Sequence, residues 1–111
     1  MGPDAEFGVH TLIRALAATC MTALAVPGKA ASHTVRIEGM QFDPQELTVH
    51  PGDRIVWVNK DLFPHTVTAN RIFNSGSIAP NASWSYIAAT SGKYAYSCTF
   101  HPTMKGKFTV Q

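Results

Sequence analysis

The sequence carries little charge of either sign, and no part of it is strongly basic or acidic. Nine lysines and arginines nearly balance seven aspartates and glutamates, giving a formal net charge of +2 over 111 residues. Proteins that bind nucleic acid usually present a clustered basic surface, and the sequence has no lysine or arginine run to form one. We therefore expect no nucleic-acid partner and at most weak electrostatic attraction to an acidic partner.

The sequence also lacks an apolar run long enough to span a membrane. Its clearest apolar run, Ala15–Val26, is shorter than the roughly 20 residues that a transmembrane helix needs. Arg14 precedes the run and Pro27-Gly28 ends it, a pattern typical of a secretory signal peptide. The alternative is an amphipathic helix packed on the domain. A signal peptide would place the protein in the periplasm or elsewhere outside the cytoplasm, after cleavage following Ala25, Ala30 or Ala31.

Cysteine is scarce, because the sequence contains only Cys20 and Cys98. Cys20 lies in the segment expected to be removed, so Cys98 would be unpaired in the mature protein. A lone thiol in an oxidising compartment has to be buried or occupied, and a bound metal would occupy it. We divide the chain into residues 1–31, a head that includes the signal peptide, and residues 32–111, a single domain.

Helical periodicity is absent from the mature part, where short alternating segments are separated by proline, glycine and asparagine. Such a pattern predicts an all-β fold, a Greek-key β-sandwich of seven to eight strands. Residues 54–59 are apolar on both faces, as expected of an inner strand. The other expected strands are residues 34–38, 46–50, 66–69, 83–88, 93–98 and 107–111.

One short loop combines three potential metal ligands. Two residues separate Cys98 from His101, and two more separate His101 from Met104. Thiolate and thioether are soft ligands that suit copper, and two His, one Cys and a long axial Met form the blue-copper set. This set needs a second histidine, which the loop does not supply. The candidate is His65, which follows Pro64 far upstream. Because loops at one end of a sandwich lie close together, His65 can reach the other three, and we predict one copper ion bound by all four residues.

Several further motifs accompany these residues between positions 34 and 111, and together they resemble the cupredoxins, in particular the plastocyanin and amicyanin group. The resemblance implies that His65, Cys98 and His101 are equatorial copper ligands and Met104 the weak axial one. It also implies a soluble carrier that transfers one electron at a time between larger redox proteins. The matching motifs are Phe42-x-Pro44, Leu47-x-Val49-x-Pro51-Gly52-Asp53, Val56-Trp57-x-Asn59, Pro64-His65-x-Val67, Gly92-x-Tyr94-x-Tyr96-x-Cys98, His101-x-x-Met104 and Gly106-Lys107.

The resemblance also suggests residues that support the ligands. Asn59 matches the family asparagine whose backbone N–H bonds the cysteine sulfur and whose side chain ties the two ligand loops together. Thr99 follows the ligand cysteine, as it does in amicyanin. Phe100 stands where amicyanin and plastocyanin have proline, which lacks an N–H. We expect its N–H to donate a second hydrogen bond to the Cys98 sulfur and to raise the reduction potential.

An apolar surface around the copper site would suit a partner protein. The alternative is that these are scattered exposed apolar side chains without a shared role. His33 offers a second, minor copper site, because it would be the third mature residue after cleavage following Ala30, and a free amine with a third-position histidine suits square-planar Cu(II). The residues expected in the partner patch are Met40, Phe63, Pro64, Phe100 and Pro102.

Two other functions compete with the electron carrier. A copper chaperone or scavenger could use the same scaffold, and the chain could be an accessory domain of a copper oxidase or reductase. The sequence shows no second histidine cluster, catalytic triad or acid pair, so we expect it not to be an enzyme. We expect a monomer that meets its redox partners transiently.

Overall fold

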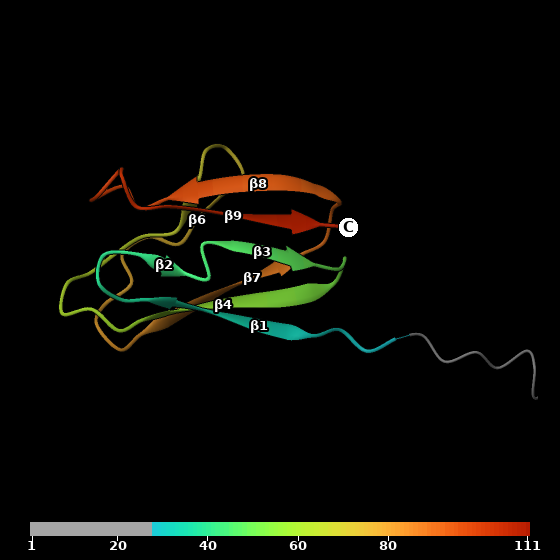
Figure 1. Ribbon diagram of the computed structural model, residues 1–111, viewed down its shortest axis with the longest axis horizontal. Helices are drawn as coiled ribbons and strands as arrows, with labels where there is room; N and C mark the ends of the chain where they lie inside the picture. The colour runs from blue at the N-terminus through green and yellow to red at the C-terminus, as the bar shows by residue number, and fades with distance from the viewer. Residues whose placement is uncertain (1–27) are drawn as a thin grey trace, which may run out of the picture.

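The computed structural model describes residues 28–111, which form two β-sheets packed face to face (Figure 1). The predicted signal peptide falls within residues 1–27 and lies outside the described part, and the same holds for most of the predicted 1–31 head. Within residues 28–111, no helix is long and apolar enough to span a membrane. The first sheet has the order β2 (Phe42–Asp43), β1 (Ser32–Ile37), β4 (Asp53–Asn59), β7 (Ser83–Ala88). The second has the order β3 (Glu46–Val49), β9 (Lys105–Val110), β8 (Gly92–Ser97), β5 (Thr68–Ala69), β6 (Phe73–Asn74).

The all-β sandwich prediction is confirmed, with differences in the shortest elements. The described residues form nine strands where seven or eight were expected. Phe42–Asp43, expected as part of a turn, pairs as β2 with Arg36 and Ile37 of β1. β6 was not predicted, because two residues are too few to show alternation. The apolar strand β4 is an inner strand, lying between β1 and β7 as its sequence predicted.

Strand direction brings three loops to one pole of the sandwich. β1 pairs in parallel with β4, from Ser32 opposite Arg54 to Ile37 opposite Asn59. β1, β4 and β8 all end at the pole on the left of Figure 1. The loops that follow them, residues 38–41, 60–67 and 98–104, therefore gather at that end, which we call the loop pole.

Aromatic side chains fill the space between the sheets. Trp57 of β4 is fully buried, with its ring centroid 5.4 Å from Tyr96 and 5.6 Å from Trp84. Burial raises the pKa of Tyr96 to about 12. Tyr96 lies opposite Gly106 in the β8–β9 pairing, and its ring covers that glycine. A Cβ at position 106 would fall 2.5 Å from the Tyr96 Cζ and hydroxyl oxygen, so any side chain there would force Tyr96 to move.

We predict that Gly106→Ala destabilises the domain by about 1–3 kcal/mol, because Tyr96 must move within a packed core. The matched control is Gly28→Ala, where a new Cβ meets nothing within 4 Å; it should change stability by less than about 0.5 kcal/mol. Denaturant unfolding of both variants measures the difference. Equal stability of the two variants would show that Tyr96 relaxes without cost.

A buried carboxylate fastens the start of β1 at the opposite pole. Asp53 accepts hydrogen bonds from the backbone N–H of Ala31 at 2.9 Å and of His50 at 3.0 Å. The His33 ring donates from Nε2 at 2.9 Å. The bonds from His50, Ala31 and His33, in that order of size, hold the pKa of Asp53 well below its usual range. Both groups that the minor copper site at His33 would use, the ring and the Ala31 nitrogen, are thus engaged by Asp53.

Asp53 should make stability depend on pH in acid. Since its pKa is lower in the folded chain than the ordinary 3.8, its stabilisation is complete above that value and is lost as the pH falls below it. We expect the melting temperature of the wild type to fall more steeply between about pH 5 and about pH 2 than that of Asp53→Asn. Glu46→Gln, at an exposed acid, should retain the wild-type slope; identical slopes for all three proteins would contradict the prediction.

Candidate metal centre

The loop from Cys98 to Met104 is folded by its own backbone hydrogen bonds. The N–H of His101 donates to the carbonyl oxygen of Cys98 at 3.2 Å, and the N–H of Met104 donates to that of His101 at 2.9 Å. The Cys98 N–H closes the loop on the carbonyl oxygen of Met104 at 3.2 Å. Cys98 directly follows β8 and Met104 directly precedes β9, so two paired strands hold both ends of this loop.

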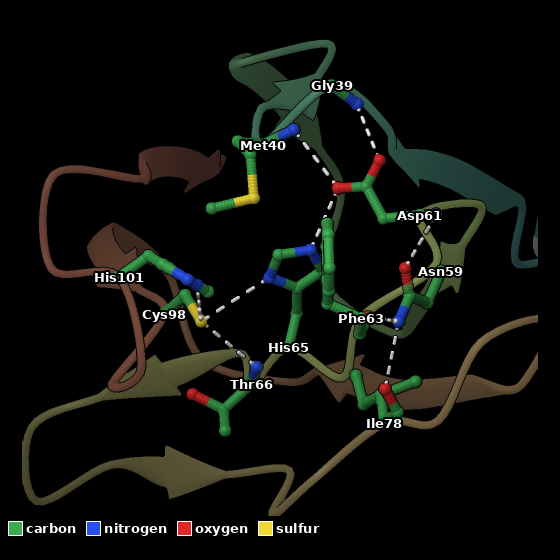
Figure 2. Close-up of polar contacts among 10 residues, drawn as sticks. All are labelled: Gly39, Met40, Asn59, Asp61, Phe63, His65, Thr66, Ile78, Cys98 and His101. Carbon is green, nitrogen blue, oxygen red and sulfur yellow. Dashed lines mark hydrogen bonds and ion pairs between the residues drawn. The ribbon is translucent and has the colours of Figure 1, made fainter.

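His65 reaches the same place from the other side. It pairs with Ile78 through two backbone hydrogen bonds of 3.2 and 2.7 Å, which fix the segment where its side chain turns inward. His65 Nδ1 lies 3.7 Å from the Cys98 sulfur, and His101 Nδ1 lies 4.0 Å from it. The three ligand atoms all lie within 4.8 Å of one another (Figure 2). Residues far apart in sequence thus form one cluster of an Sγ and two imidazole nitrogens.

Exposure differs sharply among the four predicted ligands. His65 and Cys98 are fully buried, and Met104 is 4 % exposed. His101 is half-buried and is the member of the set that reaches the surface. Met104 adjoins the cluster through the backbone bonds that close the loop on Cys98 and His101.

Asp61 holds the outer nitrogen of His65 and was missed by sequence reasoning. Its carboxylate accepts a hydrogen bond from His65 Nε2 at 2.8 Å and from the backbone N–H groups of Gly39 at 2.7 Å and Met40 at 3.0 Å (Figure 2). Burial opposes its charge, but the bonds from Met40, Gly39 and His65 outweigh burial, so the pKa of Asp61 lies below its ordinary value. The one sequence signal that could have identified Asp61 is its position four residues before His65. The contact leaves Nδ1 of His65 free to face the sulfur.

The structure corrects the role expected of the Asn59 backbone. Its N–H donates to the carbonyl oxygen of Ala82 at 3.0 Å and not to sulfur. Its buried side chain donates to the carbonyl oxygens of Phe63 at 2.7 Å and Ile78 at 2.9 Å, and accepts from the Asp61 N–H at 2.9 Å. Asn59 therefore braces the segment that carries His65 and Asp61, without bridging to the Cys98 loop. Family resemblance misplaced its N–H because every non-proline residue offers the same donor.

Thr66, directly after His65, makes the contacts that were expected of Asn59. Its N–H donates to the Cys98 sulfur at 3.3 Å. Its hydroxyl oxygen accepts from the Thr99 N–H at 2.8 Å and lies 3.1 Å from the Thr99 hydroxyl. Among residues 28–111 this is the one backbone N–H bonded to the sulfur, so the bond expected from Phe100 is not formed in this structure.

An apolar depression surrounds the exposed edge of His101. Met40, Phe63, Pro64 and Phe100 line it together with His101. Phe63 and Phe100 are more than half exposed. Four of the five residues expected in the partner patch therefore lie side by side around a predicted ligand. Pro102 is exposed but does not line the depression.

The donor set fits copper better than other common metals. Magnesium and calcium take oxygen ligands, and the cluster offers none. A structural zinc site needs four Cys, His or carboxylate ligands, and the cluster in the described residues has three. One soft thiolate with two imidazoles and a nearby thioether suits both Cu(I) and Cu(II).

Comparison with known proteins agrees with this geometry. A cupredoxin-like domain model matches residues 11–110. Amicyanin-alpha of Methylorubrum extorquens is 33 % identical over 96 % of this chain and 94 % of its own length. A plastocyanin of Scenedesmus fuscus is 31 % identical over 63 % of this chain and 86 % of its own. The structure of an oxidized amicyanin variant aligns with a TM-score of 0.70 at 29 % identity, covering 72 % of this chain and 82 % of the other.

A copper-containing nitrite reductase from Thermus scotoductus also shares the fold. It aligns with a TM-score of 0.68 at 26 % identity, covering 79 % of this chain but only 25 % of the reductase. The chain belongs to the cupredoxin-like family, and copper is its cofactor, as predicted from the sequence.

Removing the charge of Asp61 should loosen the site without unfolding the chain. Asp61→Asn replaces one acceptor oxygen with an NH₂ group that faces donors, so His65 loses its fixed orientation. We expect Cu(II) affinity to fall by about 10- to 100-fold, measured by competition with a chelator. Glu38→Gln is the control, since Glu38 is an exposed acid that pairs with Arg36. Unchanged affinity in Asp61→Asn would exclude a role for this carboxylate.

Proposed function

We propose that the protein is a soluble one-electron carrier with a type 1 copper site formed by His65, Cys98, His101 and Met104. The observation that carries this proposal is a closed set of donors in which only His101 reaches the surface, inside an apolar rim. Bound copper would supply the Cu(II)/Cu(I) couple, which gains or loses one electron and transfers no atoms. The protein's part is to hold the ligands still and to present one of them to a partner.

The ligands are held from both sides. The β8–β9 pair fixes the Cys98 loop, and Asp61 and the Ile78 pairing fix His65. Thr66 joins the two segments at the sulfur. Such a frame favours one ligand geometry in both oxidation states, so that little has to rearrange when an electron arrives or leaves.

The partners are proposed to be larger redox proteins that meet the apolar depression briefly. Phe63, Pro64 and Phe100 would exclude water around the His101 edge, so that a partner can approach this ligand closely and the electron has a shorter path. We propose an extracytoplasmic compartment, on the basis of the apolar segment Ala15–Val26 and of Cys98, the one thiol among residues 28–111, which is buried. We also propose that the protein is a monomer.

The competing functions fit these observations less well. A chaperone or scavenger has to release copper readily, whereas His65 and Cys98 are fully buried and braced. A catalytic copper enzyme needs a place for substrate beside the metal, and residues 28–111 contain a single His, Cys and carboxylate cluster of three or more members. The chain covers only a quarter of the nitrite reductase that it resembles. We therefore propose a carrier and not an enzyme.

Voltammetry of the copper-loaded protein tests the proposed function. We expect a reversible one-electron wave and an intense blue colour, both absent in Cys98→Ser because the hard hydroxyl replaces the soft thiolate. Met104→Leu should stay blue with a raised potential, since a weak axial thioether is lost and Cu(I) is favoured. A colourless copper that exchanges readily in the wild type would instead support the chaperone.

A further inference from the structure

Met40 has no assigned role in the finished copper site, yet it occupies a distinctive position beside it. It lines the apolar depression with His101, and it also lines a second cavity together with Met104. Figure 2 shows its side chain projecting from the loop toward His65 and His101. Its side chain thus adjoins both the exposed ligand His101 and the cavity lined by Met104.

The backbone of Met40 is held in an unfavourable conformation. Its φ is 61°, in the left-handed region that residues with a Cβ rarely adopt. The Asp61 carboxylate accepts the N–H groups of both Gly39 and Met40, and the same carboxylate binds His65. The Asp61 side chain therefore links the Met40 backbone to His65, a predicted copper ligand. Strain that the surrounding structure maintains in this way points to a function.

Copper has to reach a site whose strongest ligand is buried. Cys98 and His65 are fully buried, and Met104 is nearly so. The rim formed by Phe63, Pro64 and Phe100 offers no ligand atom. Among residues 28–111 the only methionines are Met40 and Met104, and Met40, at 36 % exposed, is far more accessible than Met104, at 4 %.

We propose that Met40 is an entry ligand for Cu(I), binding the incoming ion together with His101 before it passes to Cys98 and His65. A thioether selects Cu(I) over hard or borderline cations, so Met40 both binds the incoming ion first and discriminates against other metals. The step exchanges ligands and transfers no electron. Met40 then leaves the ion, because the final ligand set is complete without it. This inference rests on the proposed ligand set.

Metal uptake by the copper-free protein tests this role. Cu(I) is supplied anaerobically as a coloured chelator complex, and the loss of colour gives the uptake rate. Met40→Leu keeps the apolar volume but removes sulfur, and it should take up Cu(I) about tenfold more slowly, as expected for the loss of one weak ligand contact. Uptake of Co(II), which gains little from a thioether, should stay within about twofold of the wild type.

Phe100→Leu is the matched control, because it alters the same rim without removing sulfur; its Cu(I) uptake should stay within about twofold of the wild type. Both variants should reach the wild-type visible spectrum after oxidation. Equal slowing of Cu(I) and Co(II) in Met40→Leu would make Met40 a steric element and overturn the proposal, as would unchanged Cu(I) uptake. A wild-type protein that loads Cu(I) but gives no blue colour on oxidation would contradict the ligand set, whatever the effect of Met40→Leu on the rate.

Discussion

The junction at Thr66 is the contact on which the metal centre depends. Two segments more than thirty residues apart supply the donors, and the pairing of Thr68 with Ser97 brings them together beside the site. Thr66 joins them with its N–H on the Cys98 sulfur and its hydroxyl on the Thr99 backbone. These bonds add to the pairing of Thr68 with Ser97 in β5 and β8 and hold His65 against the Cys98 sulfur.

Each part of the sandwich can be related to this junction. The parallel pairing of β1 with β4 sends both strands toward the loop pole, where Gly39 and Met40 meet Asp61. Asp61 orients His65, and Asn59 braces the segment that carries both. At the opposite pole Asp53 accepts hydrogen bonds from Ala31 and His33 at the start of β1. Side-chain contacts at both poles thus hold the strands that lead to the predicted ligands.

The sequence predicted the features that depend on adjacent residues. Alternation identified the long strands, and the spacing of Cys98, His101 and Met104 identified a soft donor loop. The sequence alone could not locate the contacts that depend on how the loops fold. The N–H that reaches the sulfur belongs to Thr66 and not to Asn59, because residue type says nothing about where a backbone N–H points. Asp61 and the two-residue strand β6 went unnoticed because neither leaves a periodic pattern.

The function proposed for this protein requires two histidine nitrogens and one cysteine sulfur to bind a single copper ion. X-ray absorption at the copper edge of the loaded protein measures these bonds. We expect one short copper–sulfur distance and two copper–nitrogen distances of the imidazole type, in both oxidation states. A spectrum with only nitrogen and oxygen neighbours, or with several equivalent sulfurs, would contradict it.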